Sequence, residues 1–191
     1  MKMISDLSEL QFWIGVSAHD PALPFEIIAH RKFSVLVAAS YSVLFDEGIV
    51  RACCNWSRSH LDEQVAAFFV EQDTRRFFED AGYYGGVVFN GEDNHSDVHQ
   101  VLFKDQNGSP LLSIYEASQR MFLLPEDASW MLIGDRGADV ALLCFSSEDE
   151  RSDFLGEDHT IRTFGSLAEG ARHSRSFMQY PWSPEVTGSE A

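Results

Sequence analysis

The chain is poor in basic residues, and this shortage restricts the partners that it could bind. Its 191 residues include 14 Lys and Arg against 30 Asp and Glu, which gives a formal net charge of −16 at pH 7. A field of that sign repels phosphate backbones and anionic lipid headgroups, and it attracts basic surfaces. We therefore expect no direct nucleic-acid binding, no membrane binding and a basic protein as the favoured partner. The simpler alternative is that the acidity only keeps the protein soluble.

Cysteine is also scarce, and this excludes a disulfide framework. Cys53, Cys54 and Cys144 are odd in number, and two of them are adjacent. Such a pattern is typical of reduced thiols in a reducing compartment. Because the adjacent pair lies in an apolar stretch, we interpret these cysteines as buried structural residues rather than as nucleophiles activated by His60.

Long apolar runs are missing as well. The first 13 residues lack an uninterrupted apolar segment and carry Asp6 and Glu9, which a secretory signal would not. The longest nearly uncharged stretch, residues 33–45, is too short to span a bilayer. Together with the cysteine pattern, these features predict a cytoplasmic protein.

No recognisable catalytic motif is present. The sequence contains no Gly-x-Ser-x-Gly elbow, no phosphate-binding loop with its lysine and no HExxH segment. We therefore predict a protein that is not an enzyme and that needs no cofactor. The stretch closest to a metal site is residues 93–99, where His95 and His99 could meet at one ion and Asp93 or Asp97 could complete the site. A metal-dependent hydrolase that uses this loop is thus an alternative, and a solvated polar loop explains the same residues.

The spacing of apolar residues predicts helices mainly in the first half of the chain. A first helix follows Ser5 or Asp6, either of which can cap it. Two later helices are expected over residues 61–72 and 74–81, and the second ends at Gly82.

Strands are expected mainly in the second half. An early strand is predicted at 49–56, and residues 25–45 favour a buried helix or helix pair with a strand at 35–37 as the competitor. Asn107-Gly108 is a strong hairpin signal between two of the later strands. The later predicted strands are 87–89, 98–103, 111–115, 121–124, 130–133 and 140–145.

These elements predict an α+β fold, in which N-terminal helices pack on a C-terminal antiparallel meander of about five strands. The length fits a single domain over residues 1–180, followed by a flexible tail over 181–191. The charge is not spread evenly over this fold, because residues 46–158 contain 23 acidic and eight basic residues. The rest of the chain contains seven acidic and six basic residues, so it is nearly neutral. An uneven field suits the docking of a basic partner.

One segment resembles a known class of proteins. Residues 121–136, continuing through Asp139 to Phe145, combine a strand, a Leu-Pro turn, a strand that begins with Trp130, and an acidic hairpin. The segment is similar to the C-terminal sheet of small acidic immunity proteins that accompany bacterial polymorphic and contact-delivered toxins. The resemblance implies a cytosolic α+β inhibitor that occludes the active site of a cognate toxin, with a basic nuclease as one candidate.

The resemblance and the charge distribution together suggest a set of partner-binding residues. The acidic hairpin and the run after it supply the charged candidates, and nearby aromatic residues supply apolar ones. A solvated edge of the sheet with no binding role explains the acidic residues equally well. A third alternative is an acidic regulator that mimics DNA, which would need the carboxylates arranged in two rows on the surface. The candidates are Asp135, Asp139, Glu148, Asp149, Glu150, Asp153, Tyr83, Tyr84 and Trp130.

Overall fold

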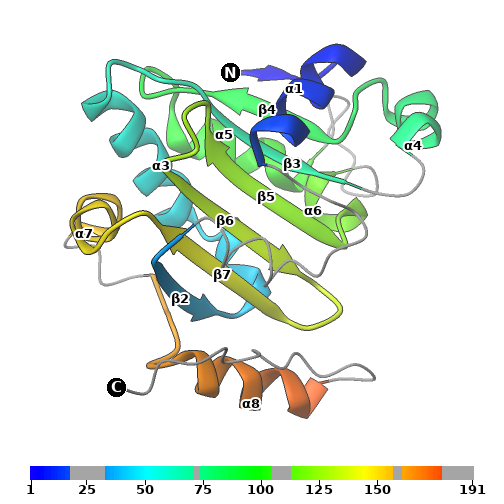
Figure 1. The fold of residues 1–191 in the computed structure, drawn as a ribbon. Helices are drawn as coiled ribbons and strands as arrows, with labels where there is room; N and C mark the ends of the chain where they lie inside the picture. Colours follow the sequence, from blue (N-terminus) through cyan, green and yellow to red (C-terminus); the bar gives the residue numbers. More distant parts are fainter. Residues whose placement is uncertain (18–32, 71–73, 105–112, 157–160, 178–191) are drawn as a thin grey trace.

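A seven-stranded antiparallel sheet forms the centre of the structure (Figure 1). The computed structural model describes residues 1–17, 33–70, 74–104, 113–156 and 161–177, so the predicted tail at 181–191 lies outside the described residues. The predicted α+β class is confirmed. The strand order is β1-β4-β3-β5-β6-β7-β2, and the bounds are β1 (Lys2–Met3), β2 (Val35–Ala39), β3 (Val65–Phe69), β4 (Gly86–Phe89), β5 (Arg120–Pro125), β6 (Trp130–Asp135) and β7 (Val140–Phe145).

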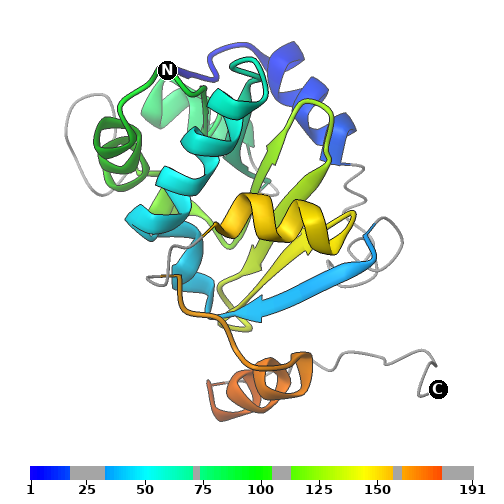
Figure 2. The same ribbon diagram turned by 90° about the vertical axis from the view of Figure 1, so that its left-hand side faces the viewer.

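Helices cover both faces of the sheet, so the described chain forms three layers (Figures 1 and 2). One face carries η1, α3, α5, α6 and α7, the other carries α1 and α8, and α4 connects β3 to β4. Successive residues along a strand point to opposite helical layers. In β6, for example, Leu132 faces the first layer and Ile133 faces the second. The bounds are α1 (Leu7–Ser17), η1 (Tyr41–Phe45), α3 (Glu47–Ser59), α4 (Thr74–Ala81), α5 (His95–Phe103), α6 (Ile114–Ala117), α7 (Glu148–Leu155) and α8 (Leu167–Phe177).

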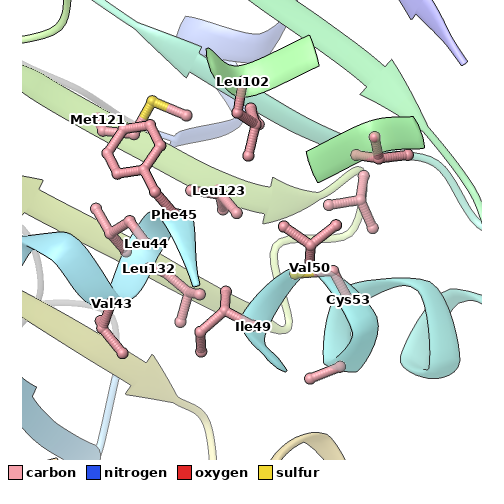
Figure 3. Close-up of a cluster of buried hydrophobic side chains, with 14 of the residues drawn as sticks. Val43, Leu44, Phe45, Ile49, Val50, Cys53, Leu102, Met121, Leu123 and Leu132 are labelled. Atoms are coloured by element: carbon pink, nitrogen blue, oxygen red, sulfur yellow. The ribbon is translucent and has the colours of Figure 1, made fainter. Parts of the chain in front are cut away.

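Helix α3 and the 3-10 turn η1 supply inner side chains of the first layer (Figure 3). Leu44 of η1 and Ile49 of α3 are fully buried in one cluster with Leu123 of β5 and Leu132 of β6. Cys53 follows Ile49 by four residues, and so it lies on the same face of α3. Each such aliphatic side chain stabilises the fold by about 1.5–3 kcal/mol relative to an exposed one.

The predicted strand at 49–56 is wrong, because these residues belong to α3. Asp46 caps this helix, since its carboxylate accepts a hydrogen bond from the Gly48 amide at 2.7 Å. The predicted helix over 61–72 is also wrong where the structure describes it, because Val65–Phe69 is strand β3. All five residues of β3 are buried, so both faces are apolar and the sequence lacks the alternation that marks a half-exposed strand.

The predicted strand at 98–103 is likewise a helix, α5. Asn94 caps it by accepting a hydrogen bond from the Ser96 amide at 2.9 Å, and Val98 and Leu102 form its buried face at a spacing of four. The strand predicted at 111–115 is replaced by α6 from Ile114 onward. The Asn107-Gly108 hairpin signal lies outside the described residues.

Other predictions for the elements are confirmed. Helix α1 begins after Asp6, whose carboxylate accepts a hydrogen bond from the Ser8 amide at 2.6 Å, and α4 ends before Gly82 with φ at +80°. Strands β4, β5, β6 and β7 lie where expected. Within 25–45, the competitor strand is present as β2 and is followed by η1, whereas 25–32 lies outside the described residues. The sheet thus draws strands from both halves of the chain, and helices α7 and α8 follow the last strand.

Among the described residues, no helix combines the length and the apolar composition needed to cross a membrane.

Gly85 provides a test of this packing. It has a φ of +70°, and a Cβ added to it would lie 2.3 Å from Cε1 of the buried Phe69 ring. We expect Gly85→Ala to lower the free energy of unfolding by about 2 kcal/mol or more, because strain and overpacking add. Gly15 of α1 has open space around it, so Gly15→Ala should raise the free energy of unfolding by about 0.5–1 kcal/mol. Urea unfolding of both variants checks this; equal effects would contradict the packing.

Candidate functional site: the acidic end of the sheet

The register of the sheet brings four loops together at one end. Val65 opens β3 beside Phe89, which closes β4, and beside Pro125, which closes β5. Trp130 opens β6 opposite Phe145, which closes β7. The loops at these strand ends are residues 60–64, 90–94, 126–129 and 146–150, which we call the acidic end. They lie toward the left of Figure 1, the side that faces the viewer in Figure 2.

These four loops carry nine carboxylates and neither Lys nor Arg. The described segments at the opposite end, residues 74–85, 114–120 and 135–139, carry five acidic and four basic residues. Among the described residues, the sheet therefore has one strongly anionic end and one end with little net charge. Two cations offset part of the anionic charge, because the Met1 ammonium lies 2.6 Å from Asp93 Oδ1 and Arg151 Nε of α7 lies 2.9 Å from Glu148 Oε2. The carboxylates of the acidic end belong to Asp62, Glu63, Glu92, Asp93, Glu126, Asp127, Glu148, Asp149 and Glu150.

Ser57, buried in α3, holds two of the loops in place. Its hydroxyl donates a hydrogen bond to the Glu63 carbonyl oxygen at 2.6 Å and accepts one from the Gly91 amide at 2.8 Å. Arg58 donates a hydrogen bond to the Gly91 carbonyl oxygen at 2.5 Å. Gly91 is needed here, because an added Cβ would lie 2.6 Å from the Arg58 backbone.

The loop after β7 continues into α7, whose first turn holds three carboxylates. Ser147 caps the helix by accepting a hydrogen bond from the Glu150 amide at 3.1 Å. The free N–H groups at the N-terminus of α7 favour negative charge, so the helix itself stabilises the acidic run. Glu150 also accepts a hydrogen bond from the indole N–H of Trp56 at 3.1 Å, which ties α7 to α3.

Glu63 lies where the carboxylates are most crowded. Its Oε1 accepts a hydrogen bond from the Asp127 amide at 2.9 Å, which links the loop after α3 to the turn between β5 and β6. Burial raises the pKa of Glu63 above its ordinary value, and the charges of Asp127 and Glu126 raise it further. The ionised form of Glu63 is therefore disfavoured in the folded protein.

Unpaired polar atoms also gather at this end. Asp62 Oδ1, Ser129 Oγ and Trp130 Nε1 are buried, and none has a hydrogen-bond partner among the described residues. Buried polar groups are normally paired, and each one left unpaired costs about 1–3 kcal/mol. These atoms lie in or directly beside two of the four loops of the acidic end.

The structure separates the acidic residues predicted to bind a partner into two groups. Glu148, Asp149 and Glu150 belong to the acidic end, and Asp153 is exposed on the same helix. The other two predicted residues, Asp135 at the end of β6 and Asp139 in the turn that follows, lie at the far end of β7, about 20 Å away for a six-residue strand.

Both carboxylates of that far turn have partners within the protein. Asp135 Oδ2 lies 3.2 Å from Arg120 Nε, and Asp139 Oδ2 lies 2.6 Å from His173 Nε2 of α8. Asp139 also accepts a hydrogen bond from the Ser40 hydroxyl at 3.0 Å. These contacts give Asp135 and Asp139 a structural role in joining strands and α8.

The aromatic candidates lie inside the protein or against it. Tyr83 and Trp130 are fully buried, and the Trp130 ring packs on Phe154 with ring centroids 4.5 Å apart. Tyr84 is half-buried and stacks on Phe78 with ring centroids 4.4 Å apart. A partner could not reach Tyr83 or Trp130 without opening the core, so we leave both out of the binding surface.

The histidines of the loop that resembled a metal site are positioned by a helix instead. His95 and His99 lie four residues apart on α5, but His95 Nε2 lies 3.3 Å from Glu47 Oε1 and His99 Nε2 lies 2.9 Å from the Phe45 carbonyl oxygen. Asp93 instead accepts a hydrogen bond from the Asn90 amide at 2.9 Å. Within the described ranges, no three His, Cys, Asp or Glu side chains are grouped to hold a metal ion.

The three cysteines are buried and free. Burial raises the pKa of Cys53 and Cys144 well above the ordinary value for a thiol, and it raises the pKa of Cys54 to about 11. All three are therefore thiols rather than thiolates at neutral pH, and a thiol is a poor nucleophile.

The partner-binding residues predicted from the sequence include only three of the nine carboxylates of the acidic end. Asp62 and Glu63 follow α3, and Glu126 and Asp127 form the turn between β5 and β6. The signal available in the sequence was that each acidic pair directly adjoins a buried strand. That signal becomes informative only once the pairing of β3 with β5 is known.

Glu63→Gln tests the crowding of charge. The amide oxygen of Gln keeps the bond to the Asp127 amide, and the substitution removes a charge that the folded state disfavours. Because the folded pKa of Glu63 is raised, the variant should have the higher melting temperature at pH 7, and the gain should vanish below about pH 4.5, where Glu63 is protonated in both states. Thermal unfolding from pH 3 to pH 8 measures this.

Glu79→Gln on α4 is the control, since Glu79 is exposed at the opposite end and pairs with Arg75 at 3.3 Å. It should leave the melting temperature nearly unchanged at every pH. If Glu63→Gln lowers the melting temperature at pH 7, the carboxylates are not crowded as described.

Comparison of this chain with family models, curated proteins and solved structures finds no match.

Proposed function

We propose that this protein is an immunity-type inhibitor, which binds a basic toxin or effector through the acidic end and occludes its active site. The observation that carries the proposal is the set of nine carboxylates in four adjoining loops that contain no Lys or Arg. A cationic protein surface is the natural complement of such a field. The protein acts as a stoichiometric binder in this proposal, with no catalysis of its own.

The asymmetry of the field supports this proposal over an acidity that serves solubility alone. A coat that only keeps a protein soluble has no need to concentrate nine carboxylates in four loops at one end of the sheet. A charged end, in contrast, orients an approaching cationic partner and raises the association rate by a factor of about 10–1,000 at low salt. An inhibitor that must reach its toxin before the toxin reaches its target benefits directly from such a rate.

Rigid attachment of the loops also supports a binding role. Ser57, Arg58 and Glu63 connect three segments of the acidic end through hydrogen bonds of 2.5–2.9 Å. A surface that is already ordered loses little conformational entropy when it binds. The hydrolase alternative gains no comparable support, since His95 and His99 make separate contacts.

Association kinetics test the proposal. The partner is sought as the product of the neighbouring gene and by capture from the source cell, and is then purified. We expect a 1:1 complex in which the partner is basic and loses its activity. The association rate should fall steeply between 20 and 200 mM salt, because the Debye length shortens from about 20 to about 7 Å.

A pair of double variants identifies the surface involved. Glu126→Gln with Asp149→Asn removes two exposed charges from the acidic end, and Glu79→Gln with Asp80→Asn removes two exposed charges from α4. The first double variant should slow association several-fold at low salt, and the second should leave it nearly unchanged. Equal effects, or a partner that is itself acidic, would rule out docking through the acidic end.

A further inference from the structure

Leu61 is an apolar side chain that the fold holds out in solvent at the acidic end. It lies between α3 and β3 with 96% of its surface exposed, which makes it the most exposed large apolar residue among those described. Asp62 and Glu63 follow it directly. An isolated Leu on a surface needs no explanation by itself, but its backbone and its surroundings single this one out.

The backbone of Leu61 is unfavourable for leucine. Leu61 and Asp62 both have φ at +59°, the left-handed region in which a Cβ clashes with the following carbonyl group. Glycine or asparagine would adopt this conformation at lower cost and would expose no apolar surface. The chain therefore places a large apolar group where both solvent and backbone disfavour it.

Hydrogen bonds on both sides hold this conformation in place. The Asp62 amide donates to the Ser57 carbonyl oxygen at 2.9 Å, and the Glu63 amide donates to the His60 carbonyl oxygen at 3.2 Å. His60 stacks flat on the buried Trp56 ring, with ring centroids 4.2 Å apart. Leu61 thus projects from a fixed turn, so little order has to be created when it contacts a partner.

Two acidic segments adjoin this turn. Asp127 donates its amide hydrogen to Glu63, so the turn between β5 and β6 lies beside the Leu61 loop. Glu150 accepts a hydrogen bond from Trp56, on which His60 stacks, so the first turn of α7 lies on another side. The exposed leucine therefore sits within the anionic surface.

We propose that Leu61 is the apolar anchor of the acidic end, and that it inserts into an apolar pocket rimmed by Lys or Arg on a basic partner protein. Protein interfaces commonly combine a buried apolar anchor with a polar rim that excludes water. The charge excludes an anionic membrane as the partner. This inference rests on the proposed function and adds to it the chemistry of the partner's site.

Two synthetic peptides of equal charge test the anchor. The first is an octapeptide of three lysines, two phenylalanines and three lysines. The second has serines in place of the two phenylalanines, and both peptides have an acetylated N-terminus and an amidated C-terminus. The full chain should bind the phenylalanine peptide about tenfold more tightly at low salt, because burial of the apolar groups adds to the same charge attraction. Fluorescence anisotropy or calorimetry measures both dissociation constants.

Leu61→Asn is the informative variant, since asparagine tolerates the positive φ and the fold should keep or raise its melting temperature. It should abolish the tenfold preference and leave the affinity for the serine peptide unchanged. Leu7→Asn, at an exposed leucine of α1 outside the acidic end, should alter neither affinity.

The outcomes separate the two proposals. If wild type binds both peptides equally and Leu61→Asn changes nothing, Leu61 is no anchor, although the acidic end still binds basic partners. If neither peptide binds at low salt, docking of basic partners through the acidic end fails as well.

Discussion

The pairing of β3 with β4 and β5 is the constraint on which the rest of the structure depends. Val65 lies beside Phe89 on one side and Pro125 on the other, and every residue of β3 is buried. A one-residue slip would move Phe68 and Phe69 to the wrong layers, so the register is strongly specified. The same register decides which loops share an end of the sheet, and so it decides where nine carboxylates meet.

The core is strong enough to tolerate this crowding of charge. Two like charges about 6 Å apart in water repel by less than about 1 kcal/mol. A single buried phenylalanine such as Phe68 contributes about 1.5–3 kcal/mol. The sheet can therefore hold unfavourable features at one end, namely the raised pKa of Glu63, the unpaired Trp130 Nε1 and the positive φ of Leu61. A cation of a basic partner placed beside Glu63 would lower the pKa of this carboxyl again, so the proposed binding would relieve part of the crowding of charge.

Parts of the fold could be predicted from the sequence because their local signals were unambiguous. Strands β5, β6 and β7 carry apolar runs bounded by turn residues, and α4 ends at Gly82. Elements α3 and β3 were interchanged, since a strand that is buried on both faces shows no alternation and α3 carries the β-branched pair Ile49-Val50 near its start. The sequence identified the acidic end only in part, because the pairing of β3 with β5 could not be predicted from it. Glu148, Asp149 and Glu150 form a visible run, whereas Asp62, Glu63, Glu126 and Asp127 join them only through the pairing of β3 with β5.

Docking of cations at the acidic end is tested most directly by mapping where a cationic ligand binds. Titration of the isotope-labelled chain with octalysine at low salt, followed by amide chemical shifts, reports every loop separately. We predict that shifts concentrate in residues 60–64, 90–94, 126–129 and 146–150, and that they disappear at high salt. Shifts spread evenly over the surface, or concentrated near α4 and the turn between β6 and β7, would contradict it.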